Sequence, residues 1–446
     1  MNKVSVLAKS INDFFNAKAD AVSMSTGFIK RKRKLKGSAF LKALILGNMS
    51  NPNCSIEMMC QMLNEESISI TKQGLDFRFT KTAVDFMESM YKEALIVFKS
   101  GIQIECEILK QFSSVKLLDS TYITLPNNME DLYKGYGSSY AGQENKAKSG
   151  VKIQLVFDYL NQLTSRVDLK EGIRSDQGYR DYLEDINKND LLIADLGYFV
   201  PESFKAIDKM GAYFISRYKS DTNIYEINTG EKLDIIACLN NKFFLEKEVF
   251  LGKKPKVKVR IIAQKLTEEQ SKERRRKANK LAKSHGYTSS KKNQKLLDWS
   301  IFITNVEEIK IQAKQVFSIY KIRWQIELLF KLYKSHIMIA DLKAKFKSYR
   351  VLCELYAKLC ITVIFHGMYS LIPELKKDQE ISLTKAIIEL RRRSRELFLA
   401  IKDNLKVLEI FLLNLVAAWS KFSLKDTHRK KRISSLNSLK LLTFFP

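Results

Sequence analysis

The chain has 446 residues and carries 76 Lys plus Arg against 49 Asp plus Glu, which gives a formal charge of +27. A hydrophobic fraction of 45% with only 17 Gly and 6 Pro excludes a disordered, collagen-like or low-complexity protein and favours a helix-rich globular one. The first residues lead into no apolar stretch of signal-peptide length, and no window approaches the roughly 20 uncharged residues of a membrane span, so we expect a soluble cytoplasmic protein.

The positive charge predicts an anionic partner. An excess this large costs self-repulsion unless an anion offsets it, and phosphate backbones do so by releasing counterions. A membrane-surface protein usually concentrates its charge on one amphipathic helix, whereas these basic residues occur along the whole chain. Nucleic acid is therefore favoured over a membrane surface.

The cysteines and histidines give little support to thiol, zinc or imidazole chemistry. The six cysteines form no CxxC pair and no zinc-like spacing, so we expect buried reduced thiols. The four histidines form no visible cluster. Carboxylates are left as the candidate reactive groups.

Residues 1–110 are predicted to form a helical region. The basic run Lys30–Lys36 precedes an apolar helical pattern, and further helices are expected after Ser55 and Thr71. Short helices, a turn and a second helix suit a helix-turn-helix-like DNA reader. A plain helical bundle fits the pattern equally well.

Residues 111–220 change to a mixed α/β pattern. Strands are predicted at Val115–Asp119 with a continuation to Thr124, Val151–Phe157, Leu163–Leu169, Leu191–Asp195 and Ala212–Ser216, and helices at Asp176–Ile186 and from Pro201. Three meandering strands followed by alternating helices and strands indicate one mixed sheet covered by helices.

Residues 221–304 interrupt this order with strand-like pieces and a very basic stretch. Lys253–Lys295 holds 16 Lys or Arg and 3 Glu, which is usual for a solvated segment and also suits a DNA contact. A strand is expected at Trp299–Thr304, and a long helix at Glu307–Ala344 makes up most of residues 305–345. Residues 346–446 read as helices with apolar faces.

Asp119 and Asp195 each follow an apolar strand. In an open sheet with parallel neighbours, ligands gather at that edge. Either residue alone is commonly a turn former or a helix cap. On adjacent strands, however, the two would suit a divalent metal, because Mg²⁺ prefers one or two carboxylates with phosphate oxygens.

Four polar residues share one face of the long helix predicted after Glu307. Tyr320, Arg323, Glu327 and Lys334 fall within a sector of roughly 60° when each residue turns the helix by about 100°. A solvated charged face is the alternative, although it would not need a tyrosine. A carboxylate flanked by Arg and Lys suits a site where Glu binds metal and the cations grip phosphates.

This spacing resembles the Tyr-Arg-Glu-Lys signature of the DDE transposases of bacterial insertion sequences, in the IS-four family. The blocks Leu118–Thr121, Ile193–Phe199 and Trp299–Asn305 also resemble that family, and Gln73–Phe79 resembles its N-terminal part. The likeness runs from about residue 35 to about residue 345. Leu196 departs from it, because many members carry Arg there.

The resemblance implies an α/β fold with an RNase H-like catalytic core, in which a β-rich insertion domain interrupts a mixed five-stranded sheet with helices, between helical N- and C-terminal regions. It implies that Asp119, Asp195 and Glu327 are catalytic and bind two divalent metal ions, Mg²⁺ with Mn²⁺ as a substitute. Further implied roles concern the DNA: phosphate contacts for Tyr320, Arg323 and Lys334, and stacking on a base turned out of the duplex for Trp299. For Trp299 a plain core position is the alternative.

We therefore expect a transposase that cuts double-stranded DNA at terminal inverted repeats, passes through hairpin ends and joins them to target DNA. The N-terminal helices would bind the repeat, and residues 346–446 would pair two protomers into a homodimer on the DNA. Such a bacterial enzyme would be cytoplasmic and associated with the nucleoid. The alternatives are a catalytically silent DNA-binding repressor of transposition and a stand-alone RNase H-like nuclease.

Overall fold

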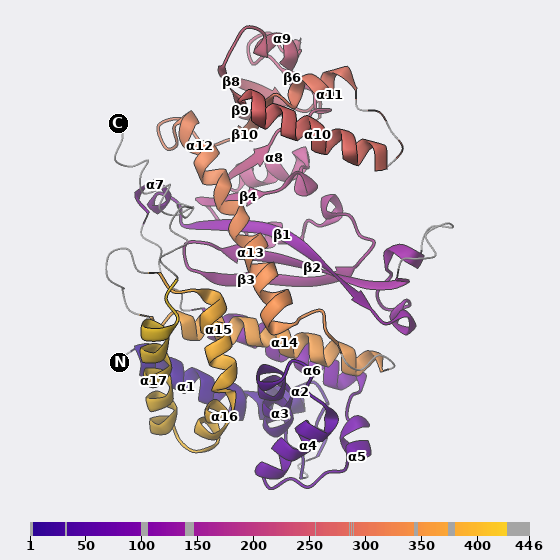
Figure 1. Cartoon of the computed structure of the whole chain (residues 1–446), viewed down its shortest axis with the longest axis vertical. Helices are drawn as coiled ribbons and strands as arrows, with labels where there is room; N and C mark the ends of the chain where they lie inside the picture. The colour runs from indigo at the N-terminus through magenta and orange to yellow at the C-terminus, as the bar shows by residue number, and fades with distance from the viewer. Residues whose placement is uncertain are drawn as a thin grey trace.

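The protein is elongated, with a sheet running through its upper and middle parts and a helical bundle at the other end (Figure 1). The computed structural model describes residues 3–31, 34–99, 106–138, 147–254, 256–284, 286, 288, 290–342, 347–372 and 380–425. A mixed α/β sheet between helical N- and C-terminal regions agrees with the fold class that the sequence predicts.

The helical bundle is built from both ends of the chain. Its N-terminal helices are α1 (Lys3–Asp13), α2 (Ala19–Ser25), α3 (Gly37–Ser50), α4 (Ile56–Glu65), α5 (Lys72–Asp76) and α6 (Lys81–Val97), with a π-helical turn between α1 and α2. Its C-terminal helices are α14 (Ser348–Tyr369), α15 (Leu383–Arg392), α16 (Ser394–Lys402) and α17 (Leu405–Phe422). Ser55 and Thr71 cap α4 and α5 through side-chain oxygens, as the sequence predicts.

Helix α14 is the centre of this bundle. By length and composition it could cross a membrane, but its apolar stretch is wholly buried inside the protein. A helix that is apolar all round needs neighbours on every side, and α14 packs against α6 and α3. The N- and C-terminal regions, which the sequence divides into separate segments, therefore share one hydrophobic core.

Ten strands form one continuous sheet in the order β3-β2-β1-β4-β5-β10-β9-β8-β6-β7. The strands are β1 (Ser114–Leu125), β2 (Ser149–Asp158), β3 (Leu163–Glu171), β4 (Asp190–Ala194), β5 (Tyr213–Arg217), β6 (Ile224–Tyr225), β7 (Lys232–Leu233), β8 (Phe244–Leu251), β9 (Val257–Lys265) and β10 (Trp299–Thr304). The strands β1, β2 and β3 form an antiparallel meander, and β4 and β5 run parallel to β1.

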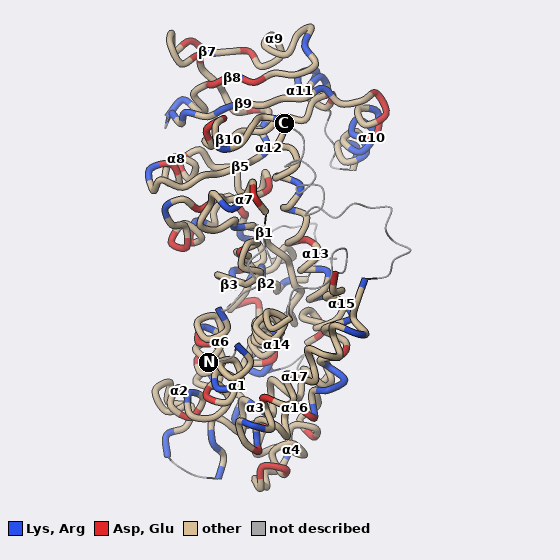
Figure 2. Tube along the Cα trace, turned by 90° about the vertical axis from the view of Figure 1, so that its left-hand side faces the viewer, with Lys and Arg blue, Asp and Glu red and all other residues tan. Residues whose placement is uncertain are grey.

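The strands of residues 221–304 extend the sheet of the preceding region. Strand β10 pairs antiparallel with β5 and with β9, so no break separates the two regions within the sheet. This part also carries α9 (Ile235–Leu239), α10 (Glu268–Ser284) and α11 (Lys291–Leu296). Most of the basic stretch is thus helical, and its Lys and Arg are blue in Figure 2.

Two helices differ from their predicted form. Asp176–Ile186 is expected as one helix, whereas the structure has two 3₁₀ turns, Asp176–Gly178 and Asp181–Asp185, the first of which is capped by Ser175. Short turns of this kind suit a connection that must place several polar side chains within a few residues.

The long helix predicted at Glu307–Ala344 is a composite run. It begins as α12 (Ala313–Tyr320), tightens to a 3₁₀ turn at Lys321–Arg323, continues as α13 (Trp324–Leu332) and ends in a π turn at Tyr333–Ile337. This run crosses the sheet diagonally and connects its upper part to the bundle (Figure 1). Because 3₁₀ and π turns change the rotation per residue, a uniform helical wheel does not describe the run.

Candidate active site

Two aspartates meet where the pairing between β1 and β4 ends. The last parallel pair is Leu118 with Ala194, so the next residues of the two segments are Asp119 and Asp195. The sequence pattern places Asp119 at the end of an apolar strand. In the structure, however, β1 continues past this residue alongside β2, with Asp119 opposite Leu155. The two carboxylates nevertheless stand at one level of the sheet, at the carboxyl edge of β4.

The third carboxylate comes from the helical run that crosses this edge. Glu327 lies in the first turn of α13, and Arg323 ends the 3₁₀ turn just before it. The Nη1 atom of Arg323 lies 3.5 Å from Oδ2 of Asp119. Its Nη2 atom donates to Oε1 of Glu327. One guanidinium therefore joins a carboxylate of the sheet to the carboxylate of the helix.

The pKa of Asp119 reflects this gathering of charge. That pKa is raised to about 6, chiefly by burial and in part by the charges of Asp195 and Glu327. The backbone N–H of Ser120, which donates to Oδ1 at 2.8 Å, and the cation of Arg323 oppose the increase. The three carboxylates thus lie within electrostatic range of one another, with Arg323 among them.

Tyr320 lies beneath this cluster rather than on an open surface. Its side chain is buried, and its hydroxyl lies 3.4 Å from the carbonyl of Ala194 and 3.5 Å from Oδ1 of Asp195. Its pKa is raised to about 12, chiefly by burial and in part by the charge of Asp195. The guanidinium groups of Arg217 and Arg323 each lie 5.9 Å from its ring centroid. Tyr320 therefore buttresses the end of β4.

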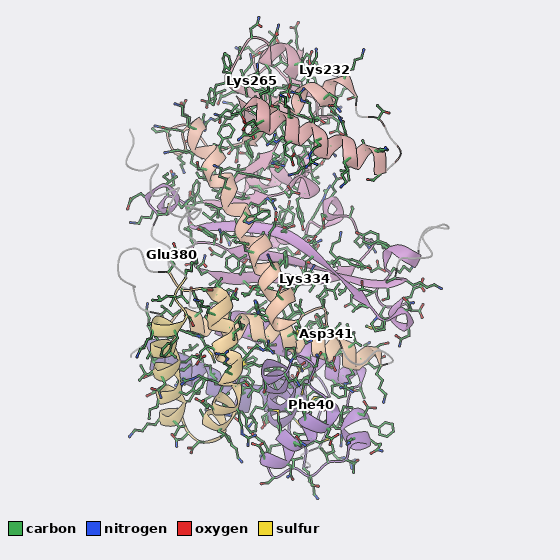
Figure 3. All side chains as sticks on the ribbon, in the orientation of Figure 1. Phe40, Lys232, Lys265, Lys334, Asp341 and Glu380 are labelled. Carbon is green, nitrogen blue, oxygen red and sulfur yellow. The ribbon has the colours of Figure 1, made fainter. Side chains whose placement is uncertain are left out.

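Lys334 and Trp299 occupy different surroundings. Lys334 is exposed in the π turn after α13, where the helical run reaches the bundle (Figure 3). Trp299 opens β10, and its side chain is only 9% exposed within the core of the upper sheet. Stacking on a DNA base would require the Trp299 ring to leave that core. Trp299 therefore occupies a core position, which is the alternative to base stacking.

The donor chemistry at the carboxylate cluster fits a divalent cation. Carboxylate oxygens are the ligands that Mg²⁺ and Mn²⁺ prefer, and a cationic group already lies against Asp119 and Glu327. Within the described ranges, no three His, Cys, Asp or Glu side chains are grouped tightly enough to hold a metal ion.

Three further side chains near the site are not predicted as functional residues from the sequence. Arg217 is exposed at the end of β5 and lies against the Tyr320 ring. Arg274 of α10 has its pKa lowered by burial and by the like charge of Arg217. Trp324 follows Arg323 directly and is 54% exposed. The terminal position of Arg217 on a parallel strand, at the same edge as Asp195, is the signal that could have identified it.

Comparison with known proteins gives a family match over the region that contains this site. Residues 110–364 match the family described as "Transposase DDE domain". The "Transposase for insertion sequence element IS231B" of Bacillus thuringiensis subsp. berliner is 28% identical over 328 residues, which cover 68% of this chain and 67% of that relative. The "Transposase for insertion sequence element IS1151" of Clostridium perfringens is 28% identical over 349 residues, covering 72% of this chain and 71% of that relative.

One solved structure aligns along most of the chain. The piggyBac transposase, in a synaptic complex with hairpin DNA, covers 97% of this chain and 90% of its own, with 10% identity and a TM-score of 0.44.

Proposed function

The chain belongs to the transposase DDE domain family and is an enzyme of DNA transposition, and we propose that it cleaves the ends of an insertion sequence and joins them to target DNA. The observation that carries this proposal is the approach of Asp119, Asp195 and Glu327 from β1, β4 and α13 around Arg323. The names of the relatives, which are transposases of insertion sequences, support the substrate class.

The three carboxylates would hold the divalent metal that the family implies, and we take the number of ions to be two. When bound, Mg²⁺ or Mn²⁺ activates an attacking hydroxyl and stabilises the leaving oxygen of a phosphodiester. The fold of the chain brings these carboxylates together from two strands and one helix. Asp119 and Asp195 are fixed by the sheet register, and Glu327 is fixed by its position one turn after Arg323.

The cations around this cluster would bind the DNA phosphates. Arg323 has the planar fork that suits phosphate oxygens, and Lys334 is exposed further along the same helical run. Arg217 and Arg274 are close enough to influence one another electrostatically. An anion between two such cations would relieve their repulsion. Tyr320 would act by supporting Asp195 and the two guanidinium groups beside its ring.

We assign the five strands β3-β2-β1-β4-β5 to an RNase H-like core. Three antiparallel strands followed by two strands parallel to the first give the mixed order expected for that core. Residues 221–304 would then be an insertion that extends the sheet, between the segment of Asp195 and the helix of Glu327. Hairpin formation during release of the ends is part of the proposed reaction, with Trp299 or the exposed Trp324 as the stacking surface.

The helical bundle would bind the inverted repeat through its N-terminal part and pair protomers through its C-terminal part. Helix α17 presents an apolar stripe to solvent, with Ile410 and Leu413 49% and 52% exposed. Such a stripe on an amphipathic helix is suited to packing against a second copy. The functional form on DNA would thus be a homodimer. A cytoplasmic, nucleoid-associated location follows from this substrate.

A cleavage assay separates this proposal from its alternatives. The full chain is incubated with labelled inverted-repeat DNA, unlabelled target DNA and Mg²⁺ or Mn²⁺, and the products are resolved on denaturing gels. We expect nicked ends, hairpins and joined products. Binding without cleavage would instead support a silent repressor, and cleavage without joining would support a stand-alone nuclease.

A further inference from the structure

Asp176 lies between strand β1, which carries Asp119, and the turn that follows Asp195. It begins a 3₁₀ turn, Asp176–Gly178, which contacts the turn Leu196–Tyr198 directly after Asp195. A Cβ added to Gly197 would lie at an ordinary van der Waals distance, 3.5 Å, from both Cβ and Oδ2 of Asp176. The turn after Asp195 therefore lies directly beside Asp176.

One carboxylate oxygen of Asp176 is held by three donors from β1 and β2. Its Oδ1 accepts from Ser120 Oγ at 2.9 Å and from Gln154 Nε2 at 3.0 Å, and it lies 3.2 Å from Lys152 Nζ. Gln154 is 0% exposed and Lys152 is 6% exposed. Hydrogen bonds to a charged group are strong, and the two donors from β2 are shielded from water, whereas the Asp176 side chain itself is 27% exposed.

The same network reaches both catalytic aspartates. Ser120 is the residue after Asp119, and its backbone N–H donates to Oδ1 of Asp119 at 2.8 Å. On the other side, Tyr198 lies three residues after Asp195, and its hydroxyl donates to Oε1 of Gln154 at 2.5 Å. Asp176 is thus joined directly to the segment of Asp119 and, through Gln154, to the turn of Asp195.

We propose that Asp176 is a positioning residue that sets the separation and orientation of Asp119 and Asp195 for metal binding. This inference rests on the proposed function, because it assumes that the two aspartates bind metal. Asp176 acts through Ser120 and Tyr198, since its Oδ1 is occupied by protein donors. Partners that orient metal ligands typically change metal affinity by about 10–100-fold when they are lost.

Metal binding itself, measured without DNA, tests this role. The affinity of the full chain for Mn²⁺ is determined from the electron paramagnetic resonance signal of the free ion. Asp176→Asn keeps the side-chain shape and removes the charge, and we expect Mn²⁺ to bind about tenfold more weakly. Ser120→Ala removes one hydrogen bond and leaves the pair of Lys152 with Asp176 intact. It is expected to fold normally and to weaken Mn²⁺ binding by a smaller factor.

The matched control is Asp190→Asn at the opposite end of β4. Asp190 pairs with the buried Lys116 at 3.0 Å, as Asp176 pairs with the buried Lys152 at 3.2 Å, and Asp185 lies 3.3 Å from the same Lys116. Each substitution therefore removes one carboxylate from a buried lysine. Thermal unfolding in a metal chelator reports the loss of stability in each variant. We expect Asp190→Asn to lose stability and to keep the Mn²⁺ affinity of the unmodified protein.

The outcomes distinguish this inference from the function on which it rests. It is overturned if Asp176→Asn and Ser120→Ala bind Mn²⁺ as the unmodified protein does, or if Asp190→Asn loses as much affinity as Asp176→Asn. If the unmodified protein binds no Mn²⁺, the proposed metal site itself fails. Weaker binding in the two variants with unchanged binding in the control supports Asp176 as the positioning residue.

Discussion

The guanidinium of Arg323 lies 3.5 Å from Oδ2 of Asp119 and also contacts Glu327, so one side chain connects the sheet to the helix of Glu327. A planar fork can make these contacts at once, whereas the single ammonium of lysine cannot reproduce them. This relationship makes Arg323 the most informative residue of the site after the carboxylates.

Replacement of Arg323 by Lys should therefore impair cleavage more than DNA binding. We expect the cleavage rate at saturating DNA to fall about 100-fold, because a preorganised donor to the reacting phosphate is lost. The control is Arg166→Lys, since Arg166 pairs with Asp168 on β3, two strands away from Asp119. Single-turnover cleavage of labelled inverted-repeat DNA measures the effect. An equal loss in both variants would contradict a specific role for Arg323.

The two tryptophans near the site should separate stability from DNA chemistry. Trp299 is 9% exposed in a core, and Trp299→Ala should lower the free energy of unfolding by about 3–5 kcal/mol. Trp324 is 54% exposed, and Trp324→Ala should change that free energy by less than about 1 kcal/mol. Urea unfolding measures both values.

Substitutions of the same two tryptophans also test which ring stacks on a base turned out of the duplex. An exposed ring beside Arg323 can stack on a base without leaving a core, so we expect Trp324→Ala to reduce the yield of hairpin ends. Gel analysis of the end products checks this. If only Trp299→Leu, which keeps an apolar side chain in the core and removes the aromatic ring, reduces hairpins, Trp299 is the stacking residue.

The basic helix α10 should contribute to DNA binding through its exposed lysines. Lys280→Gln and Lys283→Gln together should weaken binding and reduce the slope of log K against log salt by about 2, since each lost phosphate contact lowers it by about 0.9. Lys188→Gln with Lys209→Gln is the matched control, because these exposed lysines flank the opposite edge of β4 and β5. An unchanged slope in the α10 variant would remove this helix from the interface.

His366 should make the bundle less stable in acid. It is buried beside the Tyr333 hydroxyl, and burial lowers its pKa to about 4. The unfolded chain therefore binds this proton more readily than the folded chain, and stability is lost as the pH falls below about 6.5 towards 4.

Between pH 7 and pH 5 this single group should cost about 2 kcal/mol of unfolding free energy. The value is obtained by comparing urea unfolding of the unmodified protein and of His366→Gln at the two pH values. All other titratable groups are the same in the two proteins, so the difference reports His366. The same pH dependence in the two proteins would contradict the expected contribution of His366.

Local sequence patterns were sufficient to predict the features that depend on neighbouring residues. The strands β2 and β4 and the proline at the start of α8 (Pro201–Lys209) follow from local strand and helix-start patterns, and the structure contains all three, although β2 is buried on both faces. The position of Asp195 beside Asp119 depends on how strands pair, and the parallel register supplies it.

Features that arise from long-range packing could not be predicted in this way. The local sequence predicts only that Asp176 begins a helix. Its three donors, Ser120, Gln154 and Lys152, come from β1 and β2 and are brought to it by the folding of the sheet. The burial of Trp299 follows from the pairing of β10 with β9 and β5, in which Trp299 lies opposite Lys265 and Phe302 lies opposite Arg217, 34 and 85 positions earlier in the chain. Similarly, the 3₁₀ turn before Trp324 has no local signal in the helical pattern.

The most direct test of the central claim compares the unmodified protein with Asp119→Asn, Asp195→Asn and Glu327→Gln across a Mg²⁺ titration. These substitutions preserve shape and remove one ligand charge each. Because a catalytic metal supplies several kcal/mol, each variant should bind inverted-repeat DNA normally and cleave it at least about 1,000-fold more slowly. Near-normal, Mg²⁺-dependent cleavage by any of the three would show that the corresponding carboxylate does not hold the metal.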